Sequence, residues 1–141
     1  MEKKIKMVHE SEVIPTIFED RDSQRLITQE RDGSEFSLHI CTIPGFKRYN
    51  YEVIYPDRDE LLYLISGQGK QIFSGEDHDF RPGAAFFMPA GGTFKQEAKT
   101  ELKIIVVMSP PRLRSDWEAK LRPSHKSLML LEPEDAIRKK K

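Results

Sequence analysis

A chain of 141 residues has room for one domain, because this length can bury a single hydrophobic core and is short for two. Acidic and basic residues number 23 each, so no overall charge directs the protein to nucleic acid or to a membrane surface. The single cysteine, Cys41, excludes an internal disulfide and a cysteine-rich zinc site. The expected partner is therefore a small molecule or another protein, with neither nucleic acid nor membrane involved.

The N-terminal segment has no apolar run of the kind that a signal peptide or a membrane helix requires. It reads "MEKKIKMVHESEVIP", in which charged and apolar residues are mixed. We therefore expect a cytoplasmic protein, in which residues 1–22 form an arm before a barrel of residues 23–111.

The middle of the chain, from about Val13 to Met108, has short β-rich runs separated by turn residues. Strands are expected in "RLITQE", "EFSLHICTI", "YNYEVIY", "ELLYLIS", "GKQIF", "AAFFM" and "LKIIVVMS". Turns are expected at "RDGS", at Ser66 to Gly69, and in the hairpin "SGEDHDF". The pattern predicts about seven or eight strands without a helix among them, and "LKIIVVMS" is predicted to be buried on both faces.

The character of the chain changes after Pro110-Pro111. Ser115 is a suitable N-cap for a short helix through "DWEAKL", and Pro133 is a suitable first residue for a helix through "EDAIRKKK". Residues 112–141 are therefore predicted to form a tail with short helices, which ends in solvated lysines.

Two segments resemble the motifs of the cupin superfamily, G-x5-H-x-H-x3,4-E-x6-G and G-x5-P-x-G-x2-H-x3-N. Here Glu60 is followed after six residues by Gly67, and Gly83 leads through five residues to Pro89 and Gly91. The resemblance covers roughly residues 35 to 111. It implies an all-β, single-domain fold of the RmlC-like type, a double-stranded β-helix or jelly-roll barrel that often forms a homodimer.

The metal-binding histidines of those motifs are missing. Counted back from Glu60, the two histidine positions hold Ile54 and Pro56 in one register and Val53 and Tyr55 in the other. The third histidine position holds Phe94. Because a divalent ion needs several protein ligands, we expect neither a metal nor another cofactor.

Among cupins, the chain is similar to ectoine synthase, which closes a diamine-derived ring by dehydration. The segments "FSLHICTI" and "SPP" follow the order of that family, and Arg25, His39 and Thr42 fall on residues typical of it. This resemblance implies a substrate-binding role for these three residues.

The same resemblance implies an iron site made of a carboxylate, a tyrosine and a histidine. These positions correspond here to Glu60, Phe86 and Phe94, so two of the three ligands are replaced. The chain also resembles the ethanolamine-utilisation cupin, which likewise lacks the histidine pair and keeps the glutamate and "L-x-G".

The residues themselves suggest an apolar interior that holds one carboxylate. If Phe86 and Phe94 point inward beside Glu60, they are expected to contact the substrate, and desolvation raises the pKa of this glutamate and suits it to general acid or base catalysis. The alternative is that Glu60 pairs with an arginine or binds backbone amides at the barrel mouth.

Three further residues are candidates for ligand contact. Strand alternation places His39 on one face with Ser37 and Cys41, and Thr42 on the opposite face. His39 is then a ligand contact or a structural residue. Arg25 is expected either to bind the carboxylate of a ligand or to form a salt bridge with an acidic residue of the protein. Tyr55 is expected to be either a proton donor or acceptor or an ordinary strand aromatic.

Three functions remain open from the sequence. The preferred one is a metal-independent cupin that binds a small polar metabolite and could catalyse a proton-transfer, isomerisation or lyase-type step. The second is a non-catalytic dimerisation or assembly module whose barrel is filled by side chains. The third is a metalloenzyme with a nonstandard site made of Glu60, Tyr55 and His39.

Overall fold

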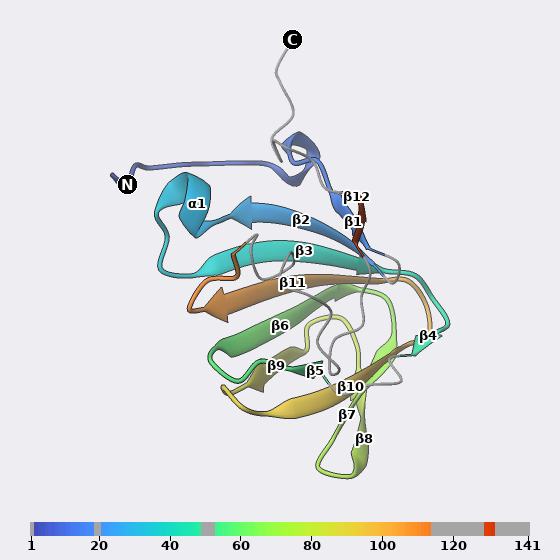
Figure 1. Ribbon diagram of the computed structural model, residues 1–141. Helices are drawn as coiled ribbons and strands as arrows, with labels where there is room; N and C mark the ends of the chain where they lie inside the picture. The colour runs from blue at the N-terminus through green and yellow to red at the C-terminus, as the bar shows by residue number, and fades with distance from the viewer. Residues whose placement is uncertain (1, 19–20, 49–52, 114–128, 132–141) are drawn as a thin grey trace.

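The protein folds into two antiparallel sheets, shown in Figure 1 by a computed structural model that describes residues 2–18, 21–48, 53–113 and 129–131. The seven-stranded sheet contains, in spatial order, β12 (Met129–Leu131), β1 (Thr16–Phe18), β2 (Asp22–Ile27), β3 (Ser37–Ile43), β11 (Leu102–Ser109), β6 (Asp59–Ser66) and β9 (Ala85–Met88). The other sheet contains β4 (Lys47–Arg48), β10 (Thr93–Ala98), β7 (Gly69–Phe73) and β8 (Glu76–Phe80), and β5 (Val53–Ile54) pairs with β10. This architecture confirms the prediction of an all-β jelly roll.

The hydrophobic core lies between the sheets and is built by strand alternation. In β11, the side chains of Leu102, Ile104, Val106 and Met108 are buried, and those between them are half-buried. The prediction that "LKIIVVMS" is buried on both faces was therefore wrong, because the outer face of β11 is only partly covered. The core is completed by β3, β6, β9, β10 and β8, which contribute Cys41, Ile43, Leu62, Leu64, Met88, Phe94, Ala98 and Phe80.

A short helix interrupts the first predicted strand. The strand β2 ends at Ile27, and α1 (Gln29–Asp32) follows it. The Thr28 hydroxyl accepts a hydrogen bond from the backbone N–H of Arg31 at 3.0 Å, and Gly33 ends the helix with φ 65°. The expectations of a strand through "RLITQE" and of no helix were wrong, because this capping stabilises a helical turn over an extended chain.

The Ser66 to Gly69 turn moves the chain from one sheet to the other. Strand β6 pairs with β11 and β9, whereas β7 pairs with β10 and β8. Gly67 has φ 100°, and a Cβ atom there would lie 2.0 Å from the carbonyl oxygen of Glu101. By contrast, β7 and β8 form the predicted hairpin, in which Ser74 and Gly75 both have positive φ angles.

Several expectations concern residues outside those described. The helices expected after Ser115 and Pro133 lie there, as do residues 49–52 of the expected strand "YNYEVIY". Strand β12 of the tail pairs with β1, which itself begins at Thr16 within the segment expected to be an arm. In the described part of the chain, the helices are three and four residues long, too short to cross a bilayer.

Candidate functional site

A cavity of about 50 Å³ lies between the two sheets. Strands β3, β6 and β11 of the larger sheet and β10 of the smaller one supply most of its walls. The apolar lining is Cys41, Ile43, Leu62, Phe94, Ile104, Val106 and Met108, and the polar lining is Arg21, His39, Tyr55, Glu60, Gln96 and Arg112. Because one water needs about 10–15 Å³ of cavity volume, the cavity has room for a few waters or for the end group of a metabolite.

Glu60 is the buried carboxylate of this cavity, with 4% of its surface exposed. Strand pairing sets it between Met88 of β9 and Met108 of β11. Burial among these apolar side chains raises its pKa to about 7, against the opposing effect of the Arg112 and Arg21 charges. Glu60 can therefore gain or lose a proton near neutral pH, as the sequence predicted.

Two buried arginines accompany Glu60, and neither was predicted from the sequence. Arg112 donates from Nη1 to the Tyr55 phenol oxygen at 3.1 Å, and its backbone N–H donates to the Ser37 hydroxyl at 2.8 Å. Arg21 lies with its guanidinium carbon 4.4 Å from the centre of the Phe18 ring. Both were missed because they lie in segments expected to be an arm and a tail, where no sequence pattern predicted a role in the site.

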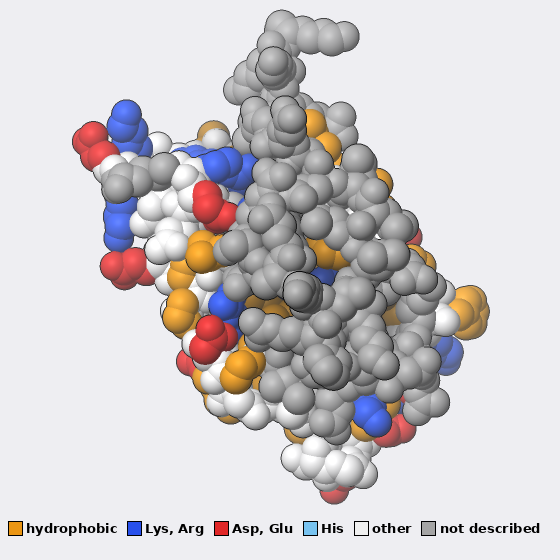
Figure 2. Space-filling model, in the orientation of Figure 1, with side chains coloured by type: hydrophobic (Ala, Val, Ile, Leu, Met, Phe, Trp, Pro, Cys, Tyr) orange, Lys and Arg blue, Asp and Glu red, His pale blue; other side chains and the backbone are white. Residues whose placement is uncertain are grey.

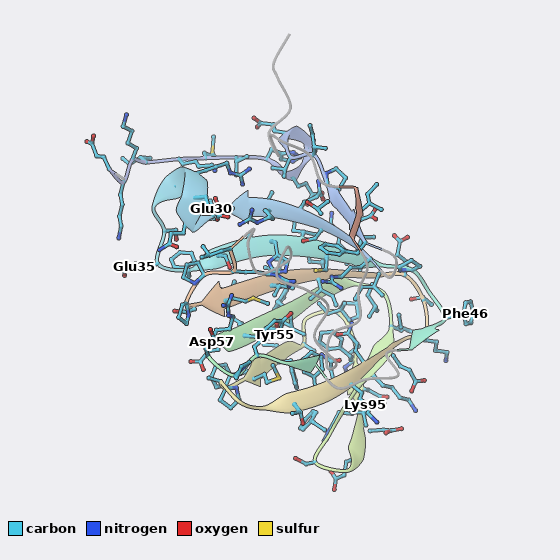
Figure 3. The ribbon with its side chains drawn as sticks, viewed as in Figure 1. Glu30, Glu35, Phe46, Tyr55, Asp57 and Lys95 are labelled. Carbon is cyan, nitrogen blue, oxygen red and sulfur yellow. The ribbon has the colours of Figure 1, made fainter. Side chains whose placement is uncertain are left out.

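His39 and Tyr55 are neutral members of the same cavity. Burial lowers the pKa of His39 well below its usual value, and the charges of Arg112, Arg21 and Arg25 lower it further. Burial also raises the pKa of the Tyr55 phenol. Tyr55, labelled in Figure 3, follows β5, and its carbonyl oxygen accepts a hydrogen bond from the Gly91 N–H at 2.9 Å.

The structure brings only some of the predicted site residues to the cavity. Glu60, His39, Tyr55 and Phe94 line it. Cys41 lines it with His39, whereas Thr42 is half-buried on the opposite face of β3, as strand alternation predicted.

Arg25 and Phe86 lie beside the cavity without lining it. Arg25 pairs with Glu30, at 2.7 Å between Nη2 and Oε1, and also donates to the carbonyl oxygen of Arg112 at 3.1 Å. Phe86 packs on Phe94 with ring centres 5.0 Å apart. The contacts of Arg25 match the salt-bridge alternative, and they help to hold Arg112 in place.

The residues around the cavity do not fit the iron that the ectoine synthase resemblance implies. Two of the corresponding positions, Phe86 and Phe94, carry hydrocarbon rings without a donor atom. Within the described residues, no three His, Cys, Asp or Glu side chains are grouped so that they could hold a metal ion. The positive charges of Arg21 and Arg112 beside Glu60 also disfavour a divalent cation.

Comparison with known proteins found a matching family and similar sequences. A family model described as ectoine synthase matches residues 3–116. The chain is 33% identical over 92 residues to L-ectoine synthase of Desulfatibacillum aliphaticivorans, an alignment that covers 63% of this chain and 68% of the relative.

Solved structures show the same fold. The ectoine synthase of P. lautus matches with a TM-score of 0.75 at 21% identity, over 92% of each chain. A protein assigned to ethanolamine utilization, protein Q of Salmonella typhimurium, matches with a TM-score of 0.54 at 20% identity, over 64% of this chain and 69% of that one. The resemblance to small cupins is thereby confirmed, and at these identities the structural likeness concerns the fold alone.

Proposed function

The chain belongs to the ectoine synthase family, and we propose that it is a metal-independent member that binds the anionic end of a small polar metabolite. The observation that carries this proposal is the placement of Arg21 and Arg112 beside Glu60. Among the described residues that line the cavity, two arginines face one carboxylate whose pKa is about 7. A guanidinium group binds carboxylates and other anions through charge-assisted hydrogen bonds, so two guanidinium groups at one cavity favour an anionic ligand.

The proposed roles follow from the chemistry of each group. The planar guanidinium of Arg112 can bind a carboxylate through two parallel hydrogen bonds. Glu60 can supply or accept a proton near pH 7, since its pKa lies there. A proton-transfer, isomerisation or lyase-type step is therefore the class of reaction proposed, in which protonated Glu60 donates to a leaving group or ionised Glu60 removes a proton.

The volume of the cavity limits the ligand. About 50 Å³ is far below the roughly 300–1,000 Å³ of drug-sized pockets. The proposal is therefore restricted to a metabolite of a few heavy atoms, or to the carboxylate end of a longer one. A cytoplasmic location stays a prediction.

Calorimetric titration with acetate, propanoate and butanoate at pH 7 tests this function. We expect at least one of these carboxylates to bind, and Arg112→Gln to weaken that binding by about tenfold or more, since a charge-assisted pair is lost. The matched control is Arg81→Gln, because Arg81 is exposed and does not line the cavity. Absence of binding by all three carboxylates to the unmodified protein would contradict the proposal.

A second candidate function, a homodimeric assembly module, is favoured by one surface. The outer face of β6 and β9 exposes Leu61, Tyr63, Ile65 and Phe87, and strand pairing places Leu61 beside Phe87. Figure 2 shows hydrophobic side chains along the side of the molecule where β11 ends in Figure 1. Exposed apolar groups that lie together are typical of protein interfaces. Binding and assembly are compatible, because the cavity lies on the inner face of the same sheet.

A further inference from the structure

A row of three polar side chains crosses the inner face of the five-stranded sheet. Gln96 of β10 pairs directly with Gln71 of β7, and Gln71 pairs with His78 of β8. Side chains of directly paired residues point to the same side of a sheet. Gln96 lines the cavity, so Gln71 and His78 point toward the interior with it.

The two glutamines are buried in apolar surroundings. Gln71 is 2% exposed and Gln96 is 4% exposed. Phe94 and Ala98, which are core residues, precede and follow Gln96 on the inner face of β10. Burying a polar amide among apolar side chains costs free energy unless the amide is hydrogen-bonded, so these two positions call for hydrogen-bond partners.

Two members of this row have buried polar atoms without a hydrogen-bond partner in the described part of the protein. Both Nε2 and Oε1 of Gln71 are buried without a hydrogen-bond partner there. Nε2 of His78 likewise has no hydrogen-bond partner, but it lies 3.7 Å from a carboxylate oxygen of Glu76, and the His78 ring stacks on Phe73 at 4.0 Å between ring centres. Buried side-chain polar atoms in native proteins nearly always have a partner, so the Gln71 amide, next to the cavity-lining Gln96, indicates a binding position.

We propose that Gln96 and Gln71 form a second pole of the cavity, which binds a hydroxyl group of the same ligand. An amide both donates and accepts hydrogen bonds, and a hydroxyl is the smallest neutral group with matching capacity. Gln96 makes the contact, and Gln71 is a positioning residue behind it. The ligand class is then a short hydroxycarboxylate, with its carboxylate at Arg112 and its hydroxyl at the glutamines.

This inference rests on the proposed function, since it assigns the other end of the same ligand. It also accounts for the amides being uncharged. Among the described lining residues, the wall formed by β10 carries no cation, so it suits a hydroxyl group better than a second carboxylate of the ligand. A site built to hydrogen-bond a hydroxyl discriminates strongly against the analogue that lacks it, because the amides would be left unpaired.

Two matched ligand pairs test the proposal by calorimetry: propanoate with 3-hydroxypropanoate, and butanoate with 4-hydroxybutanoate. In the unmodified protein, we expect the hydroxy acid of at least one pair to bind about tenfold or more tightly than its parent acid. Gln71→Met and Gln96→Met should remove this preference, so that each variant binds the hydroxy acid and its parent acid with about equal affinity. Methionine is chosen because it is unbranched, apolar and similar in length, and thermal unfolding will verify that both variants fold.

Gln68→Met is the matched control, because Gln68 is exposed in the turn before β7 and should keep the preference. Equal binding of hydroxy acid and parent acid by the unmodified protein would overturn this inference and leave the proposed function standing. A preference that persists in both methionine variants would overturn it as well. If no acid of either pair binds, the proposed function fails, and this inference fails with it.

Discussion

Arg112 reaches across the cavity to Tyr55, and the distance from its Nη1 to the phenol oxygen is 3.1 Å. This hydrogen bond ties the segment after β11 to the segment before β6, 57 residues earlier in the chain. The guanidinium carbon lies 5.8 Å from the centre of the Tyr55 ring. The contact fixes a cation near Glu60, whose ionised form that cation favours.

Replacing Arg112 should therefore change the titration of Glu60. The charge of Arg112 is the larger of the two that lower the Glu60 pKa, so Arg112→Gln should raise this pKa above about 7. Carbon-13 NMR of labelled glutamate across pH 4 to 9 measures the shift. Tyr55→Phe is the control: it removes the hydrogen bond but no charge, so it should cost about 1 kcal/mol of stability with a smaller pKa change. An unchanged Glu60 pKa in Arg112→Gln would exclude the proposed coupling.

Glu60 should make the stability of the protein fall as the pH rises. The pKa of Glu60 is 4.5 in the unfolded chain and about 7 in the folded protein, so the unfolded chain releases this proton at a lower pH than the folded protein does. The stabilising effect of the protonated state is complete below pH 4.5 and is lost as the pH approaches 7. A shift of this size corresponds to about 3 kcal/mol.

Glu60→Gln removes this titration. We subtract the free energy of unfolding of the unmodified protein, measured with urea, from that of the variant. This difference should increase by about 3 kcal/mol between pH 4 and pH 8. His39, whose pKa is lowered by burial, destabilises the protein below about pH 6.5 in both forms, and subtraction of the two curves removes its effect. Glu76→Gln, at an exposed residue, serves as control. Parallel curves for Glu60→Gln and the unmodified protein would refute a raised Glu60 pKa.

Metal content distinguishes the proposed function from a nonstandard metal site. Untagged protein purified without chelator should contain less than about a tenth of an equivalent of any transition metal, because its lining residues do not form a ligand set. Elemental analysis measures this content, and Glu60→Ala should leave it unchanged. About one equivalent that disappears in Glu60→Ala would instead establish a metal held by Glu60.

The outer face of β6 and β9 should mediate self-association. Phe87, 59% exposed, is the most exposed of its four apolar residues, so Phe87→Lys should shift a dimer toward monomer in sedimentation equilibrium. Phe46→Lys is the matched control, because Phe46 is 93% exposed and projects before β4, away from β6 and β9 (Figure 3). A monomeric unmodified protein would count against the homodimer, as would equal dissociation by both substitutions.

Gly67 should tolerate no side chain. Its φ of 100° and the 2.0 Å approach of a Cβ atom to the Glu101 carbonyl oxygen add steric overlap to backbone strain. Gly67→Ala should lower the free energy of unfolding by about 3 kcal/mol or more in urea. Gly75→Ala has a positive φ with open space around the new Cβ atom, so it should cost only about 1 kcal/mol. Equal losses in the two variants would show that steric contact at Gly67 adds nothing.

The sequence by itself determined the local features of this protein. Alternation of side chains set His39 and Cys41 on the same face, and glycine placed the turns at Gly67 and Gly75. A carboxylate among apolar residues was also enough to predict the raised pKa of Glu60. These features depend on neighbours in the chain or on the average polarity of the interior, and both can be read from one sequence.

Only the tertiary structure decided which residues share the cavity. Arg21 and Arg112 come from segments that looked peripheral, and they meet Glu60 because strands far apart in the chain pair into one sheet. The inward glutamine row likewise depends on the register between β10 and β7, which places Gln71 opposite Gln96. Register and sheet order are fixed by packing across the whole core, and a shift of one residue would turn these side chains to the other face.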